Sequence, residues 1–226
     1  MIESLRIAAS SFAPDVDFLI LLVTIIGGFG LIVAEAILFY FIFKYSAKKN
    51  PRGQYISGDE KHQKKWITIP HKVVLLADVV FIFFAVKVWY HVKQELPQAD
   101  ETIRIIGQQW SWRFVHPGPD KVLGTDDDIE TVEELHVKVG KTYHYKLETM
   151  DVIHDFSVPV FRLKQDAIPG RVMTGWFKPT REGVFDIQCA KMCGIGHGIM
   201  NARIYVQSEE EYNKWQDNKK AIAGVN

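Results

Sequence analysis

The sequence predicts a membrane-anchored all-β protein, in which a two-helix transmembrane hairpin precedes an external β-barrel or sandwich. Two long apolar segments lie within residues 1–95, and short alternating segments separated by turns fill residues 96–210. This alternation is typical of a small antiparallel β-domain. Residues 211–226 open with an amphipathic pattern and are expected to form a C-terminal helix and tail.

The apolar segments at about 17–43 and 73–92 account for the hairpin. Each is long enough to cross the roughly 30 Å hydrocarbon core of a membrane as a helix. The first is also too long to be the apolar part of a cleavable signal peptide. Glu35 and Asp78 interrupt the two segments, and we expect them to face a protein partner because a charge in lipid is costly.

The charge distribution predicts how the hairpin is oriented. The loop at 44–66 is rich in lysine and arginine, whereas Arg6 is the one basic residue before the first span. By the positive-inside rule the loop is cytoplasmic. Both termini and the β-domain are then expected on the outer, periplasmic side of the cell (inner) membrane. The formal net charge of +0 gives no reason to expect a nucleic-acid partner.

The β-domain is expected to contain six alternating segments. These are residues 102–115, 134–149, 152–158, 171–179, 183–189 and 202–208. Only the loop at 116–131 lacks a regular pattern. Its carboxylates, between Asp120 and Asp128, could bind calcium through oxygen ligands, but the twelve-residue EF-hand pattern is absent. A solvated acidic loop is therefore the preferred interpretation.

Soft metal donors are concentrated between the last two predicted strands. The segment CAKMCGIGHGIM holds four of them at spacings of four, four and three residues, namely Cys189, Cys193, His197 and Met200. Thiolate, imidazole and thioether together suit copper. A disulfide between the two cysteines is an alternative on the outer side of a membrane. Structural zinc is another, although it rarely uses a thioether. A blue-copper centre needs only one thiolate, so the second cysteine indicates a larger site.

The same segment resembles the Cys-x-x-x-Cys-Gly-x-x-His-x-x-Met motif of the cytochrome c oxidase subunit II family. Four other segments resemble this family in the same order, namely WITIP, GQQWSWRF, DVIHDFSVP and LKQDAIPGR. The resemblance covers both spans and the whole β-domain. It implies a cupredoxin-like β-domain that carries a binuclear copper centre, called CuA.

The resemblance also implies a role for individual residues. Two bridging thiolates, two imidazoles, one thioether and one backbone carbonyl would hold two copper ions. They belong to Cys189, Cys193, His154, His197, Met200 and Lys191, in that order. Trp110 would be the surface tryptophan that receives the electron. Trp112 is more simply interpreted as a packed core residue.

The function implied is that of subunit II of a haem-copper terminal oxidase. The copper centre would accept electrons from cytochrome c and pass them to haem in catalytic subunit I, which reduces oxygen within a complex of several subunits. No catalytic residue is expected in this chain, because the reduction site lies in the partner. The acidic loop is expected to help steer a basic donor.

Two departures from the family pattern keep alternatives open. Lys191 stands where the family usually has a glutamate that reaches a magnesium ion, so magnesium at the subunit interface is not expected. Gln63 stands where the family often has a glutamate at the mouth of a proton channel. Both departures favour an alternative, the copper-bearing subunit of a nitric oxide reductase of the same superfamily. A membrane-tethered copper-binding or assembly protein is a second alternative.

Overall fold

The computed structural model describes residues 7–53 and 55–223, which form two compact units. Of the described residues, 7–14 and those from Val92 onward make one unit, and those between Asp15 and His91 make the other. The chain before the first helix therefore groups with the β-strands rather than with the helices. Arg6 and the tail residues 224–226 lie outside the described part of the chain.

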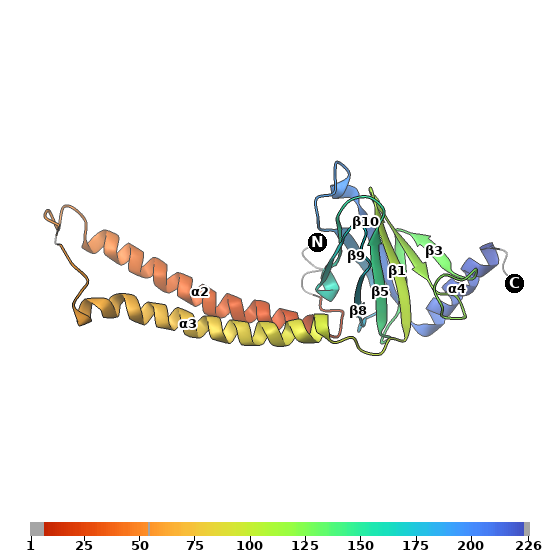
Figure 1. The fold of residues 1–226 in the computed structure, drawn as a ribbon, viewed down its shortest axis with the longest axis horizontal. Helices are drawn as coiled ribbons and strands as arrows, with labels where there is room; N and C mark the ends of the chain where they lie inside the picture. Colours follow the sequence, from red (N-terminus) through yellow and green to blue (C-terminus); the bar gives the residue numbers. More distant parts are fainter. Residues whose placement is uncertain (1–6, 54, 224–226) are drawn as a thin grey trace. The chain divides into compact units, whose positions relative to one another are not determined.

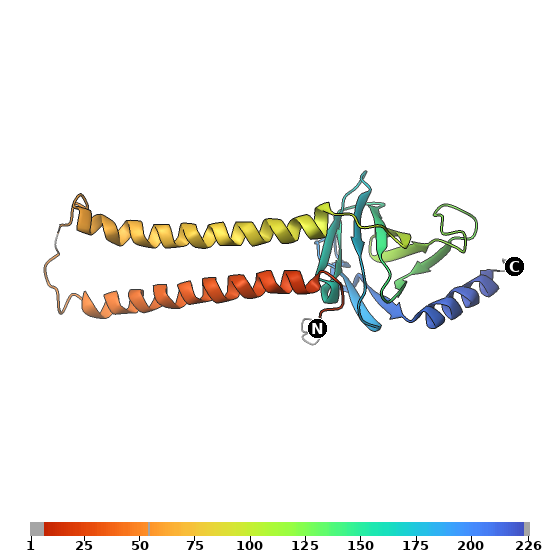
Figure 2. The same ribbon diagram turned by 90° about the horizontal axis from the view of Figure 1, so that it is seen from below.

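The helical unit is a pair of long apolar helices, as the sequence predicts. Helix α2 spans Ala13–Lys44 and helix α3 spans Lys61–Trp89, and α3 continues into the short helix η1 (Tyr90–Gln94). Each of α2 and α3 is over 40 Å long at about 1.5 Å per residue, enough to cross a membrane. They run side by side (Figures 1 and 2), and Phe18 meets Phe84 edge-on at 5.3 Å. Their apolar side chains are exposed, as expected for surfaces that face lipid or other membrane helices.

The β-unit is a sandwich of two five-stranded sheets, which confirms the predicted fold class. The first sheet has the order β3 (Ile129–Val132), β2 (Ser111–His116), β1 (Glu101–Gln108), β5 (Tyr143–Thr149) and β8 (Met173–Phe177). The second has the order β4 (Glu134–Lys138), β10 (Asn201–Gln207), β9 (Gly183–Cys189), β6 (His154–Val158) and β7 (Leu163–Ala167). Most pairs are antiparallel, but β1 pairs with β5, and β10 with β4, in parallel.

The strand boundaries differ from the prediction where the chain turns or changes sheet. The predicted strand at 102–115 is the hairpin β1–β2, with Gln108 opposite Ser111 across a two-residue turn. The predicted strand at 134–149 is two strands, because β4 and β5 belong to different sheets. Strand β3 lies in the segment predicted to be irregular, and β7 was not predicted. Strand β3 has only four residues, and β7 holds three consecutive polar residues between Leu163 and Ala167, so alternation alone reveals neither.

Aromatic side chains fill the space between the sheets. Phe156 of β6 lies 5.6 Å from Trp112, 6.3 Å from Phe114 and 6.4 Å from Tyr145 by ring centroids. All four side chains are at most 1% exposed. A core of this kind is rigid, so the loops at its end are held in fixed positions.

The N-terminal segment before α2 completes the β-unit. The Ala9 N–H donates to the carbonyl of Val160 at 2.8 Å, and Ser10 forms a single antiparallel bridge with Pro179. Phe12 is fully buried and meets Trp176 edge-on at 5.3 Å. These contacts fix the first described residues against the sandwich.

A C-terminal helix, α4 (Glu209–Ala223), follows β10 directly. It is held by Tyr212, which is 1% exposed and whose hydroxyl bonds a Glu101 oxygen at 3.2 Å. It is also held by Trp215, which stacks on His136 at 4.2 Å.

Candidate metal centre

The donor loop connects β9 to β10 and brings its two ends together. We use this name for residues 189–200. Cys189 is the last residue of β9, and its N–H donates to the carbonyl of Met200 at 3.1 Å. Between them, Gly194 has a φ of +125°, a conformation that side-chain-bearing residues rarely adopt. The short helix η3 (His197–Ile199) then returns the chain to β10.

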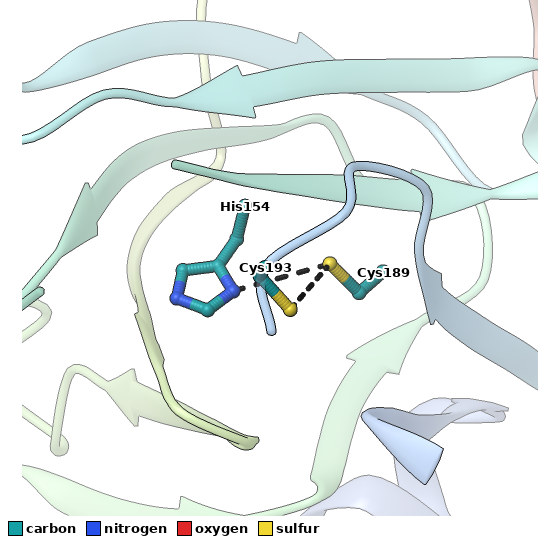
Figure 3. Close-up of side chains that lie close together, drawn as sticks. All are labelled: His154, Cys189 and Cys193. Atoms are coloured by element: carbon teal, nitrogen blue, oxygen red, sulfur yellow. Dashed lines mark hydrogen bonds between the residues drawn. The ribbon is translucent and has the colours of Figure 1, made fainter. Parts of the chain in front are cut away.

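His154 reaches this loop from a strand far away in the sequence. It is the first residue of β6, which pairs with β9 so that Phe156 lies opposite Cys189. Its Nδ1 lies 3.9 Å from the Cys189 sulfur (Figure 3). The fold therefore places an imidazole from one strand against a thiol from its neighbour.

All six predicted donor atoms meet around the two cysteine sulfurs. The sulfurs lie 3.7 Å apart, and the Lys191 carbonyl lies 3.2 Å from that of Cys189. The Nδ1 of His197 lies 3.7 Å from the Cys193 sulfur, and the Met200 sulfur lies 3.8 Å from it. Metal bonds of about 2.3 Å to sulfur and 2.0 Å to nitrogen allow two donors of one ion to lie up to about 4.3–4.6 Å apart. The donors therefore fit metal ions bound between them.

Each histidine approaches a different cysteine, and the cluster is largely enclosed. Cys189, Cys193, His154 and Met200 are all at most 8% exposed, while His197 is half-buried. A soft donor set of thiolate, imidazole and thioether suits copper.

The cysteines are free thiols, so the disulfide alternative does not describe this structure. Their sulfurs at 3.7 Å are well beyond the roughly 2.05 Å of a disulfide bond. Burial, together with the neighbouring Cys189 sulfur, raises the pKa of the Cys193 thiol to about 11. A metal ion must therefore displace thiol protons when it binds, which makes binding weaker as the pH falls.

A carboxylate not singled out in the sequence orients His154. Asp151 accepts a hydrogen bond from the Nε2 of His154 at 2.8 Å, which leaves Nδ1 free to face the sulfurs. Asp151 also accepts from the N–H of Gln109 at 2.7 Å. Although burial opposes ionisation, these hydrogen bonds lower the pKa of Asp151. A carboxylate three residues before a ligand histidine is the signal that would have indicated this partner.

Trp110 lies against the donor loop, at the turn between β1 and β2. Its indole N–H donates to the Cys193 carbonyl at 3.3 Å, and the Gln109 side chain donates to the same oxygen at 2.8 Å. A Cβ at Gly196 would lie 2.4 Å from the indole ring, so only glycine allows this approach. Trp112, in contrast, is fully buried and packs edge-on to His154 at 5.9 Å.

The Lys191 side chain points away from the sulfurs and toward strand β7. Its ammonium group lies 3.6 Å from the Asp166 carboxylate, with both side chains partly exposed. Burial, and then a hydrogen bond with Asp166, raise the pKa of the neighbouring Asp155 to about 6. Lys191 can therefore offer the donor cluster only its backbone carbonyl.

The remaining sequence candidates lie apart from the sulfurs. In the acidic loop, Asp120 and Asp128 accept hydrogen bonds from the backbone N–H groups of Val122 and Gly124. These bonds shape the loop itself, which supports a solvated acidic turn. Gln63, near the start of α3, accepts from the N–H of Gly58 at 2.9 Å and so helps to form the helix start.

Comparisons with known proteins agree with this geometry. Residues 101–208 match the family model described as cytochrome C oxidase subunit II, periplasmic domain. The chain is 32% identical over 220 residues to the alternative cytochrome c oxidase subunit 2 of Bradyrhizobium diazoefficiens, covering 87% of this chain and 78% of that protein. It is 29% identical over 225 residues to cytochrome c oxidase subunit 2 of Cereibacter sphaeroides, covering 83% and 73%.

A solved structure shares the β-unit. The crystal structure of the periplasmic domain of subunit II of cytochrome oxidase of Bradyrhizobium japonicum is 33% identical, with a TM-score of 0.50. The match covers 56% of this chain and 98% of that domain.

Proposed function

The chain belongs to the cytochrome c oxidase subunit II family, and we propose that it receives electrons at a binuclear copper centre and passes them to haem in a partner subunit. The observation that carries the proposal is the convergence of six donor atoms on the two sulfurs, 3.7 Å apart. Family membership makes the chain a subunit of an oxidoreductase complex. We further propose the number of copper ions, the electron donor and the electron acceptor.

The six donors divide naturally between two copper ions. Cys189 and Cys193 would bridge both ions, and His154 and His197 would each complete one. Met200 and the carbonyl of Lys191 would supply the weaker ligands. When bound, such a pair accepts and releases one electron, with the charge shared through the thiolates.

The chain's own residues keep this site rigid. Asp151 holds the His154 ring through Nε2, and the hydrogen bond between Cys189 and Met200 fixes the ends of the donor loop. Because the ligands are already in place before an electron arrives, little has to move when the charge changes. Trp110, in contact with the Cys193 carbonyl, is the proposed receiver of the electron.

The proposed location is a cell membrane with two spans, both termini and the copper domain lying on the periplasmic side. The hydrogen bonds of Ala9 and Ser11 to Val160 and Lys178 support this orientation. They support the proposal that the residues before α2 lie on the same side of the membrane as the sandwich, as an even number of spans predicts.

The ligand assignment can be tested in the intact chain, purified in detergent and loaded with copper. Cys193→Ser removes a bridging thiolate and should abolish the mixed-valence electron paramagnetic resonance spectrum of two coppers sharing one electron. Lys191→Ala keeps the backbone carbonyl and should largely preserve that spectrum. A spectrum lost in Lys191→Ala would show that the lysine side chain supports the site. A wild-type chain without a two-copper spectrum would favour the copper-binding or assembly alternative.

The second candidate is the copper-bearing subunit of a nitric oxide reductase. Lys191 favours it, because the ammonium group paired with Asp166 replaces the carboxylate on which interface magnesium would depend. The native complex should be assayed with oxygen and, anaerobically, with nitric oxide, using one reduced donor. Fast oxygen consumption with negligible nitric oxide turnover supports the oxidase, and the reverse supports the reductase.

A further inference from the structure

The donor atoms of the metal centre are buried, so copper needs a route to reach them. Cys189, Cys193, Met200 and His154 are each at most 8% exposed. His197 is half-buried and is the most accessible of the five side chains. Because the donors belong to a rigid, densely packed sandwich, a lasting opening in the surface is a better route than loosening of the core.

Two sides of the cluster are covered by other side chains. The indole of Trp110 lies against the donor loop and donates to the Cys193 carbonyl at 3.3 Å. The Gln109 side chain donates to the same oxygen at 2.8 Å. Toward the core, the fully buried Trp112 packs edge-on to His154 at 5.9 Å. An ion that approached from the β1–β2 turn or from inside the sandwich would have to displace these side chains.

A cavity opens on the side of strands β9 and β10. It has a volume of about 320 Å³ and is lined by three of the candidate donors, namely Cys189, His197 and Met200. Its wall also includes Gly198 and Asn201, which are both exposed, so the cavity reaches solvent. A water molecule occupies roughly 30 Å³ in the liquid, so a cavity of this size admits a metal ion together with its bound waters.

The rest of the cavity wall is polar. Gln188 of β9 lies directly opposite Asn201 of β10, so the two side chains project from the same face of the sheet. Neither side-chain amide forms a hydrogen bond within the part of the chain that the structure describes. Asp186, the third polar residue of the wall, pairs with Arg203, which offsets its charge. The free amide oxygens can replace water around an entering cation, whereas an apolar wall would remove that water without replacing it.

The cavity reaches only some of the candidate donors. Cys189, His197 and Met200 line it, whereas Cys193 and His154 are not part of its wall. The His197 Nδ1 and the Met200 sulfur lie 3.7 and 3.8 Å from the Cys193 sulfur, so an ion held by these two side chains is already beside that thiol. Imidazole and thioether suit copper, and a thioether favours Cu(I) in particular.

We propose that this cavity is the entry port through which the centre takes up copper as Cu(I), with His197 and Met200 as the first ligands. This rests on the proposed function. His197 and Met200 receive each ion at the cavity, and Cys189, Cys193 and His154 then complete its binding. The two thiol protons leave to solvent, and no electron is transferred during uptake.

The test measures how fast the intact chain, purified in detergent without copper, takes Cu(I) from its coloured complex with bicinchoninate. Loss of the colour reports uptake directly. Gly198 can carry a side chain that narrows the port, because an added Cβ would meet no atom within 4 Å. Gly198→Leu should slow uptake about tenfold or more, which corresponds to roughly 1.4 kcal/mol of added barrier. Asn201→Trp should slow it similarly, and Gly198→Ala should stay near wild type.

Ile195→Trp is the matched control. Ile195 belongs to the donor loop, is 95% exposed and is not part of the cavity wall, so a larger ring there should leave the uptake rate unchanged. After oxidation by one electron with ferricyanide, all of these variants should reach the two-copper spectrum of wild type, because no ligand has been altered.

Slow uptake in Gly198→Leu and Asn201→Trp, with an unchanged final spectrum, supports the port. Uptake at the wild-type rate in both variants would overturn it. Equal slowing in Ile195→Trp would also overturn it, because uptake would then respond to any change in the loop. If wild type takes up copper but shows no two-copper spectrum, the proposed function fails, while the order of the uptake rates still tests the port.

Discussion

Two fully buried histidines, at opposite ends of strand β2, have opposite chemical surroundings. His154 and His116 both expose 0% of their surface. His154 lies by the start of the strand, where its Nε2 bonds Asp151 and its Nδ1 faces the Cys189 sulfur. His116 ends the strand, and neither of its ring nitrogens has a hydrogen-bond partner among the described residues.

His116 is instead enclosed by aromatic rings under α4. Trp215 meets it edge-on at 5.0 Å, and His136 lies 6.5 Å away by ring centroids. His136 is itself stacked between Tyr205 at 4.5 Å and Trp215 at 4.2 Å. The comparison teaches that burial alone does not mark a histidine as a candidate metal ligand. What distinguishes His154 is that one nitrogen is anchored and the other is aimed at a soft donor.

The largest expected effect is on copper binding, which should depend on His154 and not on His116. His154→Ala removes a proposed ligand and should abolish the two-copper spectrum of the intact chain. His116→Leu replaces an unpartnered imidazole with an apolar side chain and should leave that spectrum unchanged. Electron paramagnetic resonance of both copper-loaded variants tests the contrast. A spectrum retained in His154→Ala would remove this histidine from the ligand set.

A smaller effect is expected where the anchor of His154 is weakened. Asp151→Asn keeps the side-chain shape but removes the carboxylate charge that holds the imidazole. Copper affinity should fall by about 10–100-fold, as is usual for partners of ligand histidines. Competition with a copper chelator measures this. Asp166→Asn, on the Lys191 flank, is the matched control, and equal losses in both variants would argue against a specific role for Asp151.

The smallest expected effect concerns stability against pH at the His116 end. Burial, and then the nearby His136 and Lys219, lower the pKa of His116 from 6.5 to about 3. The folded protein therefore keeps His116 neutral, while the unfolded chain binds a proton below pH 6.5. Stability is full above that pH and falls as the solution is acidified, by about 2 kcal/mol between pH 7 and pH 5.

His116→Leu should remove this share of the pH dependence. Guanidinium unfolding of the intact chain in detergent, at both pH values, gives the difference between variant and wild type. At pH 7 the variant should be as stable as wild type or up to about 1 kcal/mol more stable, because two unpartnered nitrogens disappear. An unchanged pH dependence would mean that other groups, such as His136 with Glu134, dominate the acid response.

The fold class could be predicted because its two parts have distinct patterns. Long apolar segments and short alternating ones differ in period and length, and the structure shows both. The crossover of the chain from one sheet to the other between β4 and β5 could not be predicted, because the two strands form one continuous alternating segment in the sequence. Only the parallel pairing of β4 with β10, and of β1 with β5, separates them.

The donor atoms on the loop could be predicted because their spacing is local. His154 came from the family resemblance, since nothing in its own segment ties it to residues 35 positions away. Asp151, Gln109 and Gly196 were missed because their roles depend on contacts across the sandwich. The stack around His136 was missed for the same reason, as it joins β4, β10 and α4.

The N-terminal segment has a consequence for the order of biosynthesis. Ser10 bonds the carbonyl of Phe161, 151 residues later in the chain. At roughly 5–20 residues per second, about 8–30 s pass between the synthesis of these partners. The segment around Ser10 therefore cannot complete its contacts until the strands of the sandwich that receive it have been made. Docking of Ala9 and Phe12 thus marks a late stage in folding of the domain, although these residues precede all of its strands in the chain.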